Sequence, residues 1–307
     1  MIAVVSLNPC LDKTMRLSRF DPDATNRVEC LQTDLGGKGV NVARVLSRFT
    51  GHARLFGFDF DGDPVGAELA GLLPCQLIRL NAPLRVNLKI REDSGRTIEI
   101  NERGAAVTAE SLHILEETLL SRCVPGDWAV LSGSLPAGAP VDYYGRLCAM
   151  LKETGCHVAV DASGPALAQA LSAGPDLIKP NAREFFDLTG ARAEDRPNAL
   201  SACRELHRQG VGMICLSLGP AGALLSRQEG AFFCPAADVP VRGVIGAGDS
   251  MLAGLLLALE KGMEMGEALR FASAVAGASI QLPGTRLCFP QDVPPILAGI
   301  PPVSRCS

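Results

Sequence analysis

Near the end of the chain, the segment GVIGAGDSM (residues 243–251) places a carboxylate, Asp249, where a glycine turn meets a run of helix-forming residues. The first backbone N–H groups of a helix have no intrahelical acceptor, so a helix start attracts anions. A carboxylate at such a place could accept the proton of an attacking hydroxyl while the helix start stabilises a phosphoryl group. The same Asp249 could instead be an ordinary N-cap. This segment alone leaves both interpretations open.

A second glycine-rich segment, LGGKGVNVARVL (residues 35–46), lies in the first sixth of the chain. Its glycines would let a ligand approach the backbone closely, and Lys38 adds a positive charge among them. Asn41 offers both a donor and an acceptor to a hydroxyl-rich ligand. A plain glycine turn before a helix is the alternative. The chain has no Walker P-loop and no GxGxxG fingerprint, which argues against a P-loop kinase and a nicotinamide-dependent oxidoreductase.

The elements that must position these segments follow from hydrophobic patterning. Strand-like apolar runs occur at residues 2–7, 53–58, 128–134, 157–163, 176–181 and 213–219, and stretches of helical period lie at 39–49, 109–122, 140–155 and 199–210. This alternation predicts an α/β fold with a mostly parallel sheet between layers of helices. Ligands of such sheets bind beyond the carboxyl ends of the strands, where the polar clusters SGS, DASG, KPN and SLGPAG stand here.

Two regions, residues 12–35 and 76–103, depart from this alternation of strands and helices. Their apolar and polar residues alternate as in strands, and no long helix lies between them. We expect them to form a small β appendage on a single domain that spans residues 1–307. In RVNLKI, the side chains of Arg85, Asn87 and Lys89 share one face, because successive strand residues point to opposite sides. This basic face could bind an anionic substrate, or it could belong to a charged edge strand that resists aggregation.

The composition narrows the possible functions. The chain has 307 residues, 47% hydrophobic and 20% charged, enough to bury a core. A net charge of −4 and 5% aromatic residues argue against a nucleic-acid partner. The N-terminus is typical of a strand, and no apolar run approaches the ~20 residues of a membrane span. The 11 cysteines and four histidines lack the close pairs of a zinc site. We therefore expect free thiols in a cytoplasmic protein with no membrane partner.

Taken together, these segments resemble the ribokinase-like carbohydrate kinases of the PfkB family. GGKGVN and GAGDS are similar to its two signatures, and LNPCLD, SGSLP, VDASG, KPNAREF, SLGPAGA and GTRLC fit the family's order over nearly the whole chain. The resemblance implies a three-layer α/β/α sandwich with a mostly parallel central sheet and a small β-sheet lid. SLNPCLDKT together with GGKGVNVARVL points to the branch whose substrates are already phosphorylated, so a cationic group must hold that phosphate.

The resemblance implies residue roles by matching position. Asp249 would be the catalytic base, and Gly246, Ala247 and Gly248 would form the anion hole for the transferred phosphoryl group. The residues expected to bind the sugar phosphate are Asp12, Gly37, Lys38, Asn41, Arg85, Asn87, Lys89, Arg27 and Ser134. Those expected to bind ATP are Lys179, Asn181, Ser217, Gly219 and Gly222, and those expected near Mg²⁺ are Glu184 and Asp161.

The implied activity is transfer of the ATP γ-phosphoryl group to a primary hydroxyl of a phosphorylated ketohexose. Fructose 1-phosphate is our first choice, and tagatose 6-phosphate and fructose 6-phosphate remain alternatives. A sugar-phosphate sensor without activity is an alternative of another class, although its hallmark, loss of Asp249 or of the phosphate loop, is absent. Relatives imply a homodimer through lid contacts. At Gly243 and Val244 the chain departs from the family pattern, which leaves open whether it has a monovalent-cation site.

Overall fold

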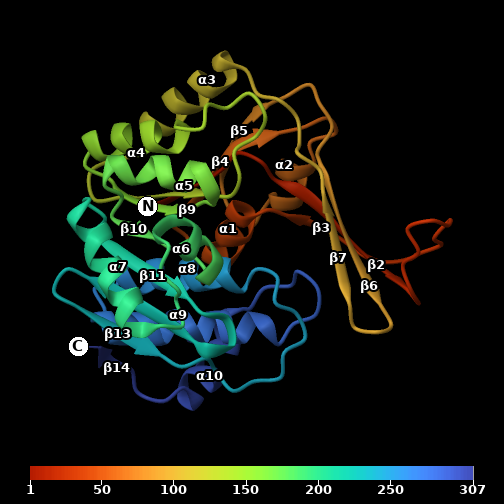
Figure 1. Cartoon of the computed structure of the whole chain (residues 1–307). Coiled ribbons are helices and arrows are strands. Elements are labelled where there is room, and N and C mark those ends of the chain that lie inside the picture. Colours follow the sequence, from red (N-terminus) through yellow and green to blue (C-terminus); the bar gives the residue numbers. More distant parts are fainter. Residues whose placement is uncertain (307) are drawn as a thin grey trace.

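A large twisted sheet forms the centre of the protein in the computed structural model, which describes residues 1–306 (Figure 1). Its strands lie in the order β14-β13-β12-β11-β10-β9-β8-β1-β4-β5. Pairing is parallel from β11 to β5, and the last three strands of the chain add an antiparallel edge. The bounds are β1 (Ile2–Ser6), β4 (Ala53–Asp59), β5 (Cys75–Arg79), β8 (Trp128–Ser132), β9 (His157–Asp161), β10 (Leu177–Ile178), β11 (Met213–Ser217), β12 (Ala223–Arg227), β13 (Gly230–Cys234) and β14 (Ser304–Cys306).

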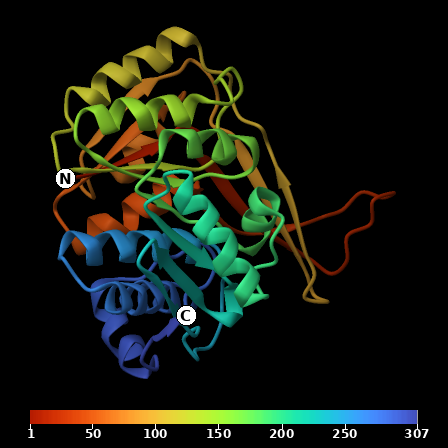
Figure 2. The same cartoon turned by 60° about the vertical axis from the view of Figure 1, so that its left-hand side comes forward.

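Helices cover both faces of this sheet, because central strands such as β1 and β8 are buried along their whole length. One layer consists of α1, α8, α9 and α10, and the other runs from α3 to α7 (Figure 2). The expected three-layer α/β/α sandwich is confirmed. The helices are α1 (Lys38–Phe49), α2 (Pro64–Leu69), α3 (Ala109–Leu120), α4 (Tyr143–Glu153), α5 (Gly164–Ala170), α6 (Ala182–Thr189), α7 (Arg196–Arg208), α8 (Ala247–Glu260), α9 (Met265–Ile280) and α10 (Val293–Gly299).

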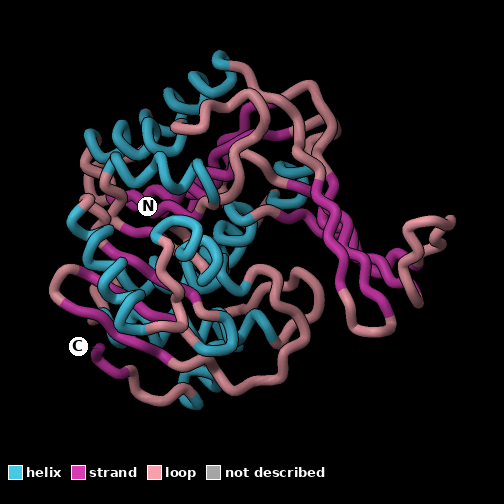
Figure 3. The backbone as a smooth tube through the Cα atoms, viewed as in Figure 1, coloured by secondary structure: helices cyan, strands magenta, loops and turns pink. Residues whose placement is uncertain are grey.

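A second sheet of four strands projects from the body as the lid (Figure 3). Its strands, in the order β3-β2-β6-β7, are β3 (Glu29–Gly36), β2 (Cys10–Leu17), β6 (Val86–Glu92) and β7 (Thr97–Asn101). The first residues of the segment expected in the lid, 76–79, pair with β4 in the large sheet instead. These residues belong to β5, which is half-buried at the edge of the large sheet. Their sequence pattern therefore resembles that of a lid strand and does not show to which sheet they belong.

In the lid, the polar face is buried and part of the apolar face is exposed, which is the opposite of an ordinary amphipathic sheet. The polar side chains of Asp12, Asn87 and Lys89 are buried, whereas Ile100 is 48% exposed. The strand register places Asp12 beside Asn87, and Leu88 beside Ile100 on the other face. An ordinary amphipathic sheet buries its apolar face, whereas this sheet has a buried polar cluster on one side and a partly exposed apolar surface on the other.

Each of the 11 cysteines is a free thiol, as expected. Among residues 1–306, no helix combines the length and the apolar composition that a membrane span requires.

Candidate active site

Asp249 is buried in the first turn of α8. The N-cap of α8 is Gly246, whose φ of 75° lies in the left-handed region that glycine tolerates. The Asp249 carboxylate makes no capping bond, and its Oδ2 accepts a hydrogen bond from Nδ2 of Asn41 at 2.8 Å. The N-cap interpretation of Asp249 is therefore wrong. The carboxylate instead joins the two glycine-rich segments, which lie 208 positions apart in the chain.

The surroundings of Asp249 adjust its acidity. Burial, followed by the charge of Asp161, raises the pKa of Asp249 to about 6, although the Asn41 hydrogen bond and the ammonium groups of Lys179 and Lys38 oppose this rise. A base whose pKa lies just below the working pH is ionised there and is also a stronger proton acceptor than an ordinary carboxylate. Asp249 therefore has the properties of a general base at neutral pH.

The backbone at the start of α8 could bind an anion. Ala247, one of the residues expected in the anion hole, already donates its N–H to the carbonyl oxygen of Val244 at 3.3 Å. The N–H of Gly248 has no intrahelical acceptor, because it belongs to the first turn. A Cβ added to Gly248 would lie 3.2 Å from Nζ of Lys179, which is itself buried. A buried ammonium therefore adds its charge to the positive end of the helix.

Lys38, Lys179, Asp161 and Glu184 form a charged network beside this helix start. Nζ of Lys38 donates to Oδ1 of Asp161 at 3.0 Å and to Oε1 of Glu184 at 3.3 Å, and Nζ of Lys179 lies 3.5 Å from Oδ2 of Asp161. Burial alone would raise the pKa of Asp161, but the two lysines lower it below its ordinary value. Asp161 thus stays ionised and holds both ammonium groups at the carboxyl ends of the strands.

Glu184 and Asn181 also have a structural role that the sequence reasoning missed. Asn181 caps α6: its Oδ1 accepts from the N–H of Glu184 at 2.8 Å, and Oε2 of Glu184 accepts from the N–H of Asn181 at 2.9 Å. This reciprocal pair is a capping box. The spacing N-x-x-E before an apolar helix was the signal that could have revealed it. Oε1 of Glu184 is not used by this capping box and accepts the hydrogen bond from Nζ of Lys38.

The carboxylates also bear on the expected magnesium ion. Within residues 1–306, no group of three or more acidic, cysteine or histidine side chains could hold a metal by itself. Mg²⁺ in nucleotide sites is usually bound by one or two carboxylates together with substrate phosphates and water. Asp161 and Glu184, both in contact with Lys38, therefore fit an ion that binds together with the nucleotide phosphates.

A mainly apolar pocket of about 710 Å³ lies beside the anion site. It is lined by Gly248 and by Ser217, Gly219 and Gly222, the residues predicted to form a nucleotide loop. Gly222 is required by its φ of 112°, and a Cβ there would lie 2.1 Å from the carbonyl oxygen of Cys234. The other walls come from residues 236–241 and from α9. The sequence reasoning missed these walls, because apolar residues carry no signal that separates a pocket from a core.

Across the site, Asp12 anchors the polar face of the lid. Its Oδ1 accepts from Nδ2 of Asn87 at 3.1 Å, and its Oδ2 accepts from Nζ of Lys89 at 2.9 Å. A Cβ added to Gly36 would lie 2.4 Å from Oδ2 of Asp12, so the glycine segment passes directly against this carboxylate. The positive charge expected to hold a phosphate at Lys89 is therefore already balanced by Asp12.

Arg85 is also used within the chain. Its Nε and Nη2 donate to the carbonyl oxygen of Asn8 at 3.1 and 2.8 Å, and its Nη1 donates to the carbonyl oxygen of Glu102 at 3.0 Å and to Oδ1 of Asn87 at 3.2 Å. Arg85 thus braces the loop after β1 against the end of β7. Arg27, another expected ligand, lies exposed in the loop between β2 and β3, and its role stays a prediction.

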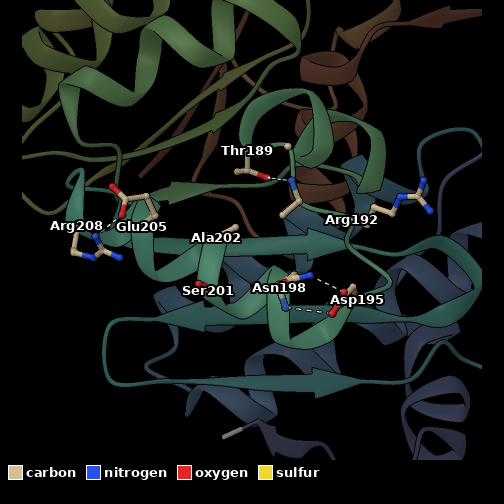
Figure 4. Close-up of a pocket in the computed structure, with 10 residues that line it drawn as sticks. Thr189, Arg192, Asp195, Asn198, Ser201, Ala202, Glu205 and Arg208 are labelled. Atoms are coloured by element: carbon tan, nitrogen blue, oxygen red, sulfur yellow. Dashed lines mark hydrogen bonds and ion pairs between the residues drawn. The ribbon is translucent and has the colours of Figure 1, made fainter.

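A second pocket, of about 490 Å³, lies between α6 and α7 (Figure 4). It contains none of the residues expected in the site. Four of its polar residues are paired with one another: Asp195 accepts from Nδ2 of Asn198 at 2.6 Å, and Glu205 forms an ion pair with Arg208 (Figure 4). Because this pocket contains none of the candidate catalytic groups, the candidate active site is the region beside Asp249.

A buried base, an anion-binding helix start, an apolar pocket and a polar lid converge at the carboxyl ends of a parallel sheet. This arrangement defines a phosphotransferase that acts on a hydroxyl group. The comparisons with known proteins agree. Residues 5–292 match the model of the pfkB family of carbohydrate kinases.

Curated relatives extend over nearly the full chain. A 1-phosphofructokinase of Rhodobacter capsulatus is 35% identical over 303 residues, which cover 94% of this chain and 93% of the relative. An ATP-dependent 6-phosphofructokinase isozyme 2 of Mycobacterium tuberculosis is 29% identical and covers 95% and 87% of the two chains. The crystal structure of phosphofructokinase-2 from Escherichia coli in complex with substrates and products superposes with a TM-score of 0.88, at 29% identity, over 97% of this chain and 98% of that one.

The chain therefore belongs to the pfkB family of carbohydrate kinases. It is a phosphotransferase whose acceptor is a sugar hydroxyl, and its fold is that of the phosphofructokinase-2 structures.

Proposed function

We propose that this kinase transfers the γ-phosphoryl group of ATP to O6 of fructose 1-phosphate. The observation that carries the proposal is Asp249, a buried carboxylate whose pKa is raised to about 6, beside Lys179 and the unpaired N–H of Gly248. The similarity to proteins named 1-phosphofructokinase supports this substrate. The similarity to proteins named 6-phosphofructokinase isozyme 2 keeps fructose 6-phosphate as the first alternative. Tagatose 6-phosphate is the second.

In the proposed mechanism, Asp249 accepts the proton of the attacking primary hydroxyl. The amide oxygen of Asn41, which accepts no hydrogen bond within the chain, and the carboxylate of Asp12 hold other sugar hydroxyls, and both residues are buried and rigidly placed. The N–H of Gly248 and the ammonium of Lys179 stabilise the charge that develops on the transferred phosphoryl group. Magnesium, when bound, would neutralise nucleotide phosphate charge next to Asp161 and Glu184. The base of the nucleotide would occupy the apolar pocket of about 710 Å³.

A product analysis tests this function. The chain is incubated with ATP, Mg²⁺ and fructose 1-phosphate, and the products are followed by ³¹P NMR. A new phosphate monoester at C6 together with ADP supports the proposal. Formation of ADP without a new ester contradicts it. Binding of fructose 1-phosphate without turnover, when Asp249 is intact, would favour the sensor alternative.

We also propose that two chains pair through the apolar face of the lid. Ile100 on this face is 48% exposed, and the register places Leu88 beside it, while the polar face is buried. A second copy of the same surface would cover these side chains. We expect Ile100→Asp to convert a dimer into a monomer in sedimentation velocity, whereas Val124→Asp, at an exposed valine after α3, leaves the mass unchanged. A monomeric wild type, or a dimer that survives Ile100→Asp, contradicts this assembly.

A further inference from the structure

We propose that Thr285 is a positioning residue that couples binding of the sugar substrate at the lid to binding of the nucleotide beside α8. This inference rests on the proposed function, because it concerns how the two substrates of that reaction meet in one site. Thr285 belongs to the segment GTRLC (residues 284–288), which follows α9 and takes no part in the proposed mechanism. The contacts of this segment reach the lid on one side and the start of α8 on the other.

The contact with the lid is made by the side chain of Thr285. This residue is buried, and its Oγ1 donates a hydrogen bond to Oδ2 of Asp34, in strand β3 of the lid. Oδ1 of Asp34 accepts a second hydrogen bond from Nε2 of Gln32 at 2.8 Å. The register of β2 and β3 pairs Asp34 with Asp12, the carboxylate proposed to hold sugar hydroxyls. Thr285 is therefore bonded to the lid strand that lies next to the proposed sugar site.

The same segment is packed against the glycine turn that leads into α8. A Cβ added to Gly243 would lie 3.0 Å from the carbonyl oxygen of Gly284, the residue before Thr285. A Cβ added to Gly246, the N-cap of α8, would lie 2.6 Å from Cδ2 of Leu287. Residues on both sides of Thr285 therefore lie close to the turn that precedes the proposed anion site.

The end of the segment is fixed to the body of the protein. Nη1 of Arg48, in the last turn of α1, donates to the carbonyl oxygen of Cys288 at 3.0 Å. The N–H of Cys288 donates to Oγ of Ser279, in α9, at 3.1 Å. Because this end is held, a displacement of Thr285 is passed on to the packing against the glycine turn.

The hydrogen bond between Thr285 and Asp34 gives the coupling its physical basis. A sugar phosphate that binds against Asp12 changes the position of β3, and the bond carries this change to the glycine turn. The turn is thereby held in the arrangement that binds the nucleotide phosphates. Such coupling is reciprocal, because each ligand must change the affinity for the other by the same factor. Loss of the Thr285 hydroxyl should therefore remove the coupling and leave each separate site in place.

Isothermal titration calorimetry measures the coupling factor. The affinity for fructose 1-phosphate is determined alone and with saturating Mg²⁺ and AMP-PNP, an ATP analogue that does not transfer its γ-phosphoryl group. The titration is then repeated with the two ligands in the reverse order. Thr285→Val removes the hydroxyl and keeps the shape of the side chain, whereas Thr285→Ser keeps the hydroxyl. The matched control is Thr154→Val, which removes a hydroxyl that bonds the carbonyl oxygen of Leu151 at the end of α4.

We expect the analogue to tighten binding of fructose 1-phosphate about fivefold or more in the wild type, in Thr285→Ser and in Thr154→Val. In Thr285→Val the factor should fall below about twofold in both orders of titration, while each ligand alone binds as in the wild type. Asp34→Ala removes the acceptor from the lid side and should lower the factor in the same way. This second variant decides the inference if Thr285→Val does not fold.

The outcomes separate this inference from the proposed function. A wild type without coupling, or an unchanged factor in a folded Thr285→Val, overturns the role of Thr285. If that variant does not fold, an unchanged factor in Asp34→Ala does so. A factor that is also lost in Thr285→Ser would assign the effect to side-chain size and would overturn the inference too.

Coupled binding without phosphoryl transfer from ATP contradicts the proposed function and leaves the role of Thr285 standing. The titrations are repeated with fructose 6-phosphate, so a wrong choice between the two sugar phosphates does not affect the test. A wild type that binds neither sugar phosphate contradicts both proposals.

Discussion

Replacing Asp249 with Asn should make the protein more stable and, at the same time, almost inactive. The substitution keeps the size of the side chain and an oxygen that can accept the hydrogen bond from Nδ2 of Asn41, now 2.8 Å from the carboxylate. It removes a negative charge that is buried close to Asp161. Stability and activity therefore depend on the same carboxylate in opposite directions.

The size of the stability change follows from the pKa. Folding raises the pKa of Asp249 from 3.8 to about 6, so between these pH values the folded chain holds a proton that the unfolded chain has lost. The free energy of unfolding therefore falls as the pH rises through this range, and above pH 6 the loss is constant at about 3 kcal/mol. Asp249→Asn should restore up to this amount at pH 8, and should raise the melting temperature by roughly 5 °C.

The activity should change in the other direction. Loss of a positioned general base reduces kcat by ~10² or more. In the wild type, protonation of the same group should make kcat/KM fall about tenfold for each pH unit below 6, because only the ionised carboxylate accepts a proton. This acid limb should be absent from the residual activity of the variant.

Urea unfolding at pH 8 and pH 4 measures the stability, and steady-state kinetics measures the activity. Asp142→Asn, at an exposed aspartate, serves as the control and should change neither quantity. The stability gain should be present at pH 8 and should nearly vanish at pH 4. A destabilised Asp249→Asn at pH 8 would refute the reasoning about burial, and a kcat within tenfold of wild type would refute the role as base.

Three further predictions use the same approach. Gly248→Ala should weaken ATP binding at least tenfold in calorimetry, because the new methyl would lie 3.2 Å from Nζ of Lys179 in the anion site; unchanged ATP affinity would contradict this site. Arg85→Ala should lower the melting temperature as well as activity, because it removes bonds to three backbone carbonyls, so a loss of sugar affinity at full stability would instead favour a direct ligand role. Iodoacetamide should modify the exposed Cys30 but not Cys10, since burial raises the pKa of the Cys10 thiol to about 12; mass spectrometry that finds both modified equally would disagree.

Much of the fold could be predicted, because fully buried parallel strands have an unambiguous pattern. The apolar runs at residues 2–7 and 128–134 became β1 and β8. The run at residues 176–181 forms a strand only at Leu177–Ile178, because Pro180 lacks the N–H of a sheet ladder. The antiparallel hairpin of β12 and β13 was not predicted, since its residues alternate weakly and it lies at the edge of the sheet.

The site was predictable in its residue types but not in its pairings. The sequence marks Asp249 and Asn41 as polar residues beside glycines, but only the fold shows that they bond to each other. The alternation of the lid strand correctly separates Arg85 and Lys89 from the apolar face. It could not show that Lys89 meets Asp12, because this contact depends on the pairing of β2 with β6. The number of lid cations available to bind a ligand was therefore overestimated when it was judged from residue charge alone.

The most direct test of the proposed function is a coupled assay of ADP release with fructose 1-phosphate, fructose 6-phosphate, tagatose 6-phosphate and free fructose. We expect the highest kcat/KM with fructose 1-phosphate, lower values with the other two phosphates, and a value at least a hundredfold lower with free fructose. ADP release should require Mg²⁺ and should be lost in Asp249→Asn. If no sugar phosphate releases ADP, or if free fructose is used as well as fructose 1-phosphate, the proposed sugar-phosphate kinase activity is contradicted.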